Sequence, residues 1–182
     1  MILILLFLRS RRAGEGIAAV AAVVAGTWIW GRLGPAPDLL LIGAPLAVAV
    51  LIGSSTAPPF AELEATIGRR LPLLRLLHAG GTLLLGTLTL FLADHTWVLS
   101  RNAIGFTGLA LLSSRFLGAG MAWVVPFAYS ALAVLSDPGT LWNWPRQAAG
   151  DHFSAILALA LATAGLALIS WDGAHHTAGA DS

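Results

Sequence analysis

Residues 153–171 read FSAILALALATAGLALISW, a stretch without a charged side chain that follows Asp151 and His152 and ends at Asp172. A helix needs about 20 consecutive apolar residues to cross the hydrocarbon core of a bilayer, and this stretch is close to that length. It therefore predicts a transmembrane helix. The rest of the chain repeats the pattern, because uncharged apolar stretches alternate with short segments that carry arginine, proline or acidic residues.

The composition supports a membrane protein. Of the 182 residues, 57% are hydrophobic and 10% are charged, against about 25% charged residues in an ordinary soluble domain. We expect an all-α, integral membrane helical bundle with about six transmembrane helices. Residues 1–171 form a single transmembrane domain in this prediction, and residues 172–182 form a flexible C-terminal tail. The predicted spans lie near residues 16–33, 39–57, 75–93, 102–115, 117–136 and 152–171.

The fourth predicted span is unusually short. Residues 102–115 cannot cross about 30 Å of hydrocarbon as a straight helix that rises 1.5 Å per residue. The fourth and fifth stretches are therefore expected to form a tight hairpin around residues 115–120. The sequence leaves open whether both of them cross the membrane fully.

The arginines indicate an orientation, because cytoplasmic loops of membrane proteins carry an excess of basic residues. All ten basic residues are arginine. If the spans alternate and the N-terminus is cytoplasmic, seven arginines lie inside and three outside, which favours this topology and a multi-pass position in the plasma membrane. The seven are Arg9, Arg11, Arg12, Arg69, Arg70, Arg75 and Arg115, and the three are Arg32, Arg101 and Arg146.

The N-terminal segment is apolar but too short to span. In residues 1–12 the charges follow the apolar run, whereas a secretory signal has the opposite order. We predict an interfacial helix over residues 1–12 that lies on the cytoplasmic leaflet with its arginines near lipid phosphates. Disorder of these residues is the alternative.

A short cytoplasmic helix is predicted between the second and third spans. Pro58 and Pro59 suit its start, and acidic residues near its beginning and arginines near its end complement the helix dipole. Three apolar residues fall at i, i+3 and i+7 and form one stripe that fits lipid, the bundle or a groove of a cytoplasmic partner. A solvated linker helix without a partner is the alternative. The residues that carry the prediction are Phe60, Glu62, Leu63, Glu64, Ile67, Arg69 and Arg70.

Tryptophans and glycines suggest how the spans are anchored and packed. Tryptophan favours the headgroup level, so Trp97, Trp142 and Trp144 are predicted to be interfacial anchors at the external ends of the spans. A substrate gate is the alternative for Trp142 and Trp144. Glycines within the spans let helix backbones approach closely and favour a packed bundle. These are Gly80, Gly81, Gly86, Gly105 and Gly108.

Histidines near the span ends are candidate ligands of haem. His78 and His95 lie at opposite ends of the third span, 17 residues apart. This separation is too long for two ligands of one haem in the same plane, although stacked haems remain compatible with it. His175 and His176 fall in the predicted flexible tail, where a ligand pair is not expected.

A metal site at the external face is a further alternative. The pairs Asp94–His95 and Asp151–His152 would supply carboxylate and imidazole, and both ligand types suit a divalent ion. Polar residues at span ends are more often interfacial caps. The interfacial role is therefore the prediction for these pairs.

Several classes of function are disfavoured by what the sequence lacks. Without cysteine the chain cannot carry a CxxC redox pair, a disulfide or a thiolate metal site. No ionisable residue is placed deep in a predicted span, which disfavours proton pumps and ion-coupled transporters. A nucleophile–base arrangement, a carboxylate-rich metal motif and a Gly-Lys phosphate loop are also missing, so we predict no catalytic residue and no cofactor in this chain.

The order of these features resembles the type-2 class of ATP-binding-cassette (ABC) transporter permease subunits, particularly the short actinobacterial ones. The resemblance covers most of the chain. It is carried by RSRR at residues 9–12 before an Ala/Val-rich span ending in TWIWG at 27–31, PFAELE at 59–64 before Arg69 and Arg70, RNAIGFTGLALL at 101–112, and WNWP at 142–145. The chain is short for the family, and its brief fourth span departs from the pattern.

This resemblance implies six spans, an N-terminal elbow helix and a coupling helix that docks on a separate ATPase subunit. Residues 59–70 would form the coupling helix, with Glu62 and Glu64 in contact with the ATPase. The chain would be the permease subunit of an exporter, while ATP and Mg²⁺ would bind to the partner subunit, which performs the hydrolysis. A second permease subunit, the same or related, would complete the pathway. The lipid bilayer is the other expected partner, and no nucleic acid is expected.

Two other classes remain open. One is a small haem- or metal-binding membrane redox subunit that uses His78, His95 or His152. The other is a noncatalytic accessory or immunity protein that assembles with a larger complex.

Overall fold

The computed structural model describes residues 13–33, 38–55, 71–94, 97–140 and 142–178. In these residues the protein is all-α, as predicted, and contains no strand. The α-helices are α2 (Ala13–Leu33), α3 (Asp38–Ser55), α5 (Leu71–Asp94), α6 (Trp97–Leu117), α7 (Val124–Leu135) and α8 (His152–Ala178). Two short 3-10 helices, η1 (Ala119–Met121) and η2 (Trp144–Arg146), flank α7 in the chain.

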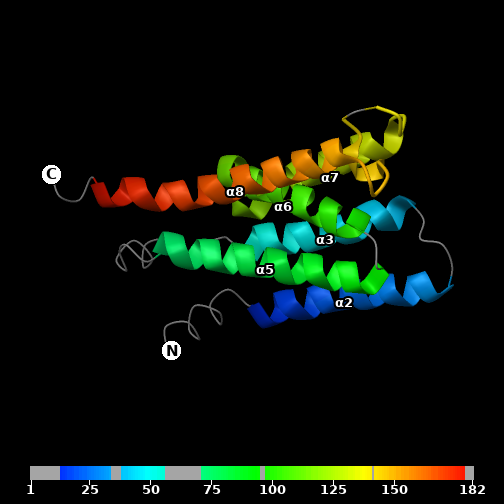
Figure 1. The fold of residues 1–182 in the computed structure, drawn as a ribbon. Coiled ribbons are helices and arrows are strands. Elements are labelled where there is room, and N and C mark those ends of the chain that lie inside the picture. Colours follow the sequence, from blue (N-terminus) through cyan, green and yellow to red (C-terminus); the bar gives the residue numbers. More distant parts are fainter. Residues whose placement is uncertain (1–12, 34–37, 56–70, 95–96, 141, 179–182) are drawn as a thin grey trace.

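The α-helices lie side by side and run along the bundle in alternating directions (Figure 1). One end of the bundle holds the start of α2, the end of α3, the start of α5 and the end of α8, and we call it the Ser55 end. The opposite end, the Asn143 end, holds the chain between α7 and α8, together with the end of α2 and the start of α3. The first and last described helices therefore begin and finish at the same end.

Helix α6 forms the centre of the bundle. It packs against α3, α5, α7 and α8, and most of its residues are buried. Its Phe106 joins a core cluster with Ile42, Ala49 and Trp144, and its Leu99 joins a second cluster on the α3–α5 side. Its burial includes the polar residues Arg101 and Asn102, and the helix is exposed at Trp97 and at its last three residues.

Glycines bring α6 and α8 into backbone contact. A Cβ added to Gly108 would lie 2.3 Å from the Leu161 carbonyl carbon and 2.5 Å from the Ala162 nitrogen. A Cβ on Gly165 would lie 3.0 Å from the Gly108 carbonyl oxygen. The two helices can cross this closely only because both positions lack a side chain.

The glycines predicted to permit close approach divide into two groups. A Cβ at Gly86 would lie 2.9 Å from a methyl of Val48, and a Cβ at Gly105 would lie 2.3 Å from the Trp144 indole. Gly80 and Gly81 have nothing within 4 Å of an added Cβ, so they do not pack in this way.

The fourth and fifth predicted spans differ from the observed helices in length. Residues 102–115 belong to α6, a helix of 21 residues, because α6 starts at Trp97 and continues through Arg101. Of residues 117–136, only Leu117, which ends α6, and the 12 residues of α7 are α-helical. Gly118, with φ of 93°, ends α6 in the left-handed region that favours glycine, and η1 follows before α7 begins. The short element of the pair is therefore α7.

Helix α8 is also longer than predicted. It contains 27 residues and ends at Ala178, whereas the predicted span ended at residue 171 and residues 172–182 were assigned to a flexible tail. Among the described residues, only α8 contains an apolar window long enough by itself to cross a bilayer, His152–Ile169, with a mean hydropathy of 2.0. Leu40–Ser55, Leu76–Leu92 and Val124–Leu135 are shorter apolar helical segments.

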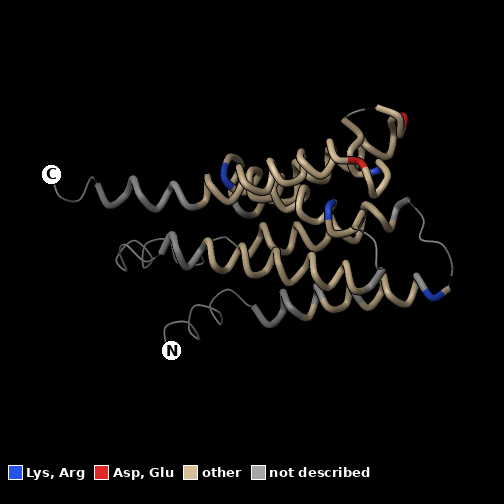
Figure 2. The backbone as a smooth tube through the Cα atoms, viewed as in Figure 1, with Lys and Arg blue, Asp and Glu red and all other residues tan. Residues whose placement is uncertain are grey.

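The exterior of the bundle is largely apolar. Large hydrophobic side chains are exposed on α2, α5, α7 and α8, and they include Leu84 at 69%, Leu135 at 85% and Ile156 at 66% exposure. The charged residues drawn in Figure 2 lie toward the ends of the helices, except that Arg101, in the second turn of α6, is buried within the bundle. The bundle thus has an apolar belt between two polar ends.

Candidate functional site

The predicted ATPase-contacting residues lie outside the described residues. All of them fall in the 56–70 segment: Phe60, Glu62, Leu63, Glu64, Ile67, Arg69 and Arg70. The structure does describe the helices on either side of that segment, because α3 ends at Ser55 and α5 begins at Leu71. Both of these residues lie at the Ser55 end of the bundle (Figure 1).

A side-chain hydrogen bond joins α3 to α5 near this connection. The Ser55 hydroxyl lies 3.1 Å from Nε2 of His78, and it donates to the Ile52 carbonyl at 2.7 Å. A hydroxyl has one hydrogen to donate, so when it donates to Ile52 it accepts from Nε2 of His78. The bond couples the last turn of α3 to α5.

The most heavily bonded polar group of the described residues lies toward the other end. Arg101 is fully buried in α6. Its Nη2 donates to the carbonyls of Trp144 and Gln147, and its Nη1 donates to the carbonyl of Ala148, each at 2.9 Å. Nε and Nη2 also lie 3.4 Å from Oδ1 of Asn102. The guanidinium therefore binds the carbonyl of Trp144, which begins η2, and the carbonyls of the two residues that follow η2, in charge-assisted hydrogen bonds.

Asn102 extends this network to α3. Its Nδ2 donates to the Leu41 carbonyl at 3.0 Å and to the Pro145 carbonyl at 2.8 Å. Both hydrogens of the amide are thereby used, and its oxygen faces Arg101. The Arg101–Asn102 pair thus holds α3, α6 and the η2 segment together.

The chain between α7 and α8 is further tied to α7 by Asn143. Its buried Nδ2 lies 3.0 Å from the Ala133 carbonyl, 3.2 Å from the Ser136 hydroxyl and 3.2 Å from the Asp137 carbonyl. Gln147 donates to the Pro138 carbonyl at 2.8 Å. These bonds satisfy backbone carbonyls in the last turn of α7 and in the chain that follows it.

Trp144 is a core residue, which corrects its prediction as an interfacial anchor. Its side chain is fully buried, against Gly105 and 5.2 Å from the Phe106 ring centroid. It stacks on Tyr129 at 6.0 Å. A buried wedge of this kind does not fit the alternative of a movable gate, whereas Trp142 is exposed and its carbonyl accepts a hydrogen bond from the Tyr129 hydroxyl.

Asp151 begins α8 as an N-cap. Its carboxylate accepts hydrogen bonds from the Ser154 backbone N–H at 2.9 Å and from the Ser154 hydroxyl. These two bonds lower the pKa of the Asp151 carboxyl below its ordinary value, and the nearby positive charge of Arg101 lowers it further. Asp151 is thus a structural cap that also faces the buried cation.

The proposed external metal site is not assembled by the described residues. His152 is exposed at the start of α8, while His95 lies outside the described residues. Within the described part of the chain, no group of three or more His, Asp or Glu side chains could hold a metal ion. His175 and His176 lie along α8, and their side chains are not among those described.

The sequence contained a signal for the buried network that the span prediction did not use. Arg101 and Asn102 are adjacent polar residues directly before a glycine-rich apolar run. The prediction places the boundary of a span at this charged residue. The structure shows that the helix continues through both residues because the η2 segment supplies their partners.

Comparison with known proteins does not assign the chain to a family. No protein-family model matches it, and no curated protein or solved structure shows significant similarity to it.

Proposed function

We propose that the protein is an integral membrane protein whose helical bundle crosses the plasma membrane about six times. The observation that carries this proposal is the apolar exterior of the bundle, which has its charged residues toward the ends. Soluble monomers rarely expose contiguous apolar patches larger than a few hundred Å². Helix α8 supports the same conclusion, because only 28% of its apolar window is buried. A core helix of a soluble protein would be mostly buried.

Several hydroxyl groups in the apolar belt are satisfied without water, whereas the buried Thr107 hydroxyl of α6 has no hydrogen-bond partner among the described residues. Thr87 and Thr89 of α5 donate to the carbonyls of Leu83 and Leu85, one turn earlier in their own helix, each at 2.9 Å. Ser100 of α6 donates across to the Thr87 carbonyl at 2.9 Å. Bonding within and between helices is what a polar side chain needs in hydrocarbon, where no water is present.

Within the membrane, we propose that the chain acts as the permease subunit of an ABC exporter. One support is the resemblance in sequence pattern. The other is that residues 56–70 connect α3 to α5 at the Ser55 end, where α2 also starts and α8 ends. With the N-terminus in the cytoplasm, this end faces the ATPase subunit. Glu62 and Glu64 contact that subunit, and a second permease subunit completes the pathway.

Motion of the ATPase would reach the bundle through α3 and α5. The Ser55–His78 hydrogen bond links the two helices next to the connection, and both helices pack on α6. A displacement of the connection therefore acts on the central helix. The two conformations of the transporter differ in stability according to whether ATP is bound to the partner.

The topology can be tested with single cysteines, because the natural chain has none. Gly139 lies at the Asn143 end, and Gly120 follows the end of α6 at the Ser55 end. A cysteine can be placed at either position, because an added Cβ meets no atom closer than 3.5 Å. A membrane-impermeant maleimide should label Gly139→Cys in intact cells and Gly120→Cys only after lysis. The reverse pattern would overturn the orientation, and labelling of both sites in intact cells would overturn the alternating spans.

The coupling role is tested with the complex purified from its own membranes. We expect an ATPase to copurify and to hydrolyse ATP at a rate that depends on this chain. A Glu62→Gln/Glu64→Gln double variant should lose most of that dependence, while Asp137→Asn, which alters an exposed carboxylate at the Asn143 end, should keep it. Unchanged hydrolysis in the double variant would refute the contact. Visible haem absorption in the purified chain would favour the redox alternative instead.

A further inference from the structure

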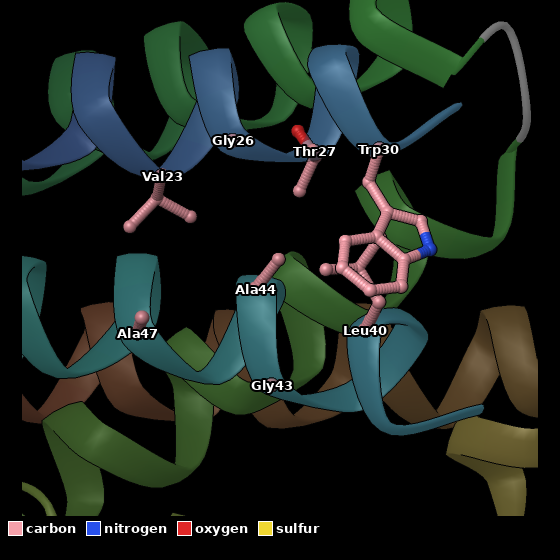
Figure 3. Close-up of a pocket in the computed structure, with 8 residues that line it drawn as sticks. All are labelled: Val23, Gly26, Thr27, Trp30, Leu40, Gly43, Ala44 and Ala47. Carbon is pink, nitrogen blue, oxygen red and sulfur yellow. The ribbon is translucent and has the colours of Figure 1, made fainter. Parts of the chain in front are cut away.

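A cleft of about 480 Å³ lies between α2 and α3 (Figure 3). Its volume is in the range of small-molecule binding sites, about 300–1,000 Å³. Gly26 of α2 and Gly43, Ala44 and Ala47 of α3 border it, so small side chains leave the space open. Trp30 reaches across one end of the cleft.

The cleft occupies one half of the bundle along the helix axes. On α2 it runs from Trp30, in the last turn, to Val23, at the middle of the helix. On α3 it runs from Leu40, near the start, to Ala47. Seven residues of helix rise about 10 Å, whereas one leaflet contributes about 15 Å of hydrocarbon. The cleft therefore begins near one membrane surface and stays within a single leaflet.

This extent distinguishes a lipid chain from a helix of a second copy that packs nearly parallel to α2 and α3. Such a spanning helix would run through both leaflets and would need a groove along most of both helices. An acyl chain belongs to one leaflet and lies along the membrane normal, as the cleft does. The apolar lining fits it, and Thr27, only 5% exposed, is the one hydroxyl-bearing residue among the lining residues.

The end of α2 beside the cleft suits a negatively charged headgroup, although of its exposed side chains only Trp30 lines the cleft. Trp28 and Trp30 are both exposed in the last turns of α2, and tryptophan favours the headgroup level. Arg32 is exposed two residues beyond Trp30, and its guanidinium lies 4.7 Å from the centre of the Trp28 ring. An arginine at this depth attracts a phosphate group.

We infer that the cleft between α2 and α3 binds one acyl chain of an anionic glycerophospholipid, whose headgroup lies beside Arg32. This inference rests on the membrane embedding in the proposed function, and it does not depend on coupling to an ATPase. The bound lipid fills space between α2 and α3 that the protein's own side chains leave open.

The experiment uses the full chain, purified in dodecyl maltoside and titrated with palmitoyl-oleoyl phosphatidylglycerol or with the corresponding phosphatidylcholine. Native mass spectrometry counts the bound lipids. Gly43→Leu fills the cleft, and its added Cβ meets nothing within 4 Å, so the helices need not move. Gly26→Leu is an independent filling variant with the same property. Gly81→Leu on α5 is the matched control, because it adds the same side chain with equally open surroundings away from the cleft.

We expect the wild type and Gly81→Leu to retain one phosphatidylglycerol per chain. The two filling variants should bind it at least tenfold more weakly, which is about 1.4 kcal/mol. Arg32→Gln should bind the two lipids equally, with affinity for phosphatidylcholine unchanged.

Three results would overturn the inference. The first is equal retention of phosphatidylglycerol in the wild type and both filling variants. The second is no lipid bound to the wild type at any concentration tested, when labelling of the single-cysteine variants has verified the membrane embedding. The third is a dimer of the wild type that the filling variants dissociate without release of lipid, which would assign the cleft to a second copy. A chain that alkaline carbonate removes from membranes would instead overturn the proposed membrane embedding.

Discussion

Gly108 is the position where a single added methyl group should do the most damage to the bundle. In Gly108→Ala the new Cβ would lie 2.3 Å from the Leu161 carbonyl carbon, where the usual separation of nonbonded carbons is about 3.5–4.0 Å. Helices α6 and α8 must therefore separate by about 1 Å or more at their crossing. Because the obstructing atoms are backbone, no side-chain rotation can relieve the contact.

The expected cost follows from this geometry. Overpacking of a close-packed site costs about 1–3 kcal/mol, and a clash with backbone places Gly108→Ala near the upper part of that range. The glycine-to-alanine change also favours helix by up to about 1 kcal/mol. Gly81→Ala, in open surroundings on α5, receives this gain without a clash. We therefore expect Gly108→Ala to be destabilised and Gly81→Ala to be neutral or stabilised.

The free energy of unfolding can be measured by titrating the protein in mild detergent with sodium dodecyl sulfate and following tryptophan fluorescence. Gly165→Ala provides a second test of the same crossing, because its Cβ would lie 2.9 Å from Cβ of Leu111 and 3.0 Å from the Gly108 carbonyl oxygen. If Gly108→Ala is as stable as Gly81→Ala, then α6 and α8 do not cross in backbone contact and the reasoning fails.

Three further predictions concern the Asn143 end. Asn102→Leu leaves two backbone carbonyls without their donors. It should therefore lower the free energy of unfolding by about 2 kcal/mol in the same titration. An unchanged free energy of unfolding would contradict the anchoring role of Asn102. Trp144→Ala should lower the free energy of unfolding by about 3–5 kcal/mol because it empties a buried site. Trp142→Ala, at an exposed position, should lower it far less. Equal losses in the two variants would contradict the packing of Trp144 in the core. The hydrogen bonds that lower the pKa of Asp151 stabilise the folded state fully above the unfolded pKa of about 3.9. This stabilisation is lost as the pH falls further, because the carboxylate becomes protonated. Asp151→Asn should therefore lose less stability than the wild type between pH 5 and pH 2, as measured by thermal unfolding.

Most of the helical architecture could be predicted from the placement of charges. Uncharged stretches bounded by Arg32, Asp38, Arg75 and Asp94 gave helices close to the observed α2, α3 and α5, because a charged residue in an apolar run usually marks the edge of a span. The rule failed at Arg101, which lies inside α6. Its partner carbonyls belong to residues 43 to 47 positions later, and local sequence does not show which distant segment will supply them.

The candidate sites were predictable to different degrees. The role of Gly108 in close packing followed from its lack of a side chain, since any helix crossing at that point benefits from it. Trp144 was assigned to the interface on composition alone, because an indole suits the headgroup level as well as a core. Only the tertiary contact with Gly105 distinguishes these two environments. The residues predicted to contact an ATPase lie in the 56–70 segment, outside the described residues, and their role stays a prediction.

The wide sequence separation within the Arg101 network has a consequence for how the protein is made. At about 5–20 residues per second, the ribosome delivers the 43 to 47 residues between Arg101 and its carbonyl partners in roughly 2–9 seconds. During that interval the guanidinium has none of these acceptors and must keep its hydration. If the bundle spans a membrane as proposed, helix α6 cannot settle at its final depth until the segment that precedes α8 has been synthesised.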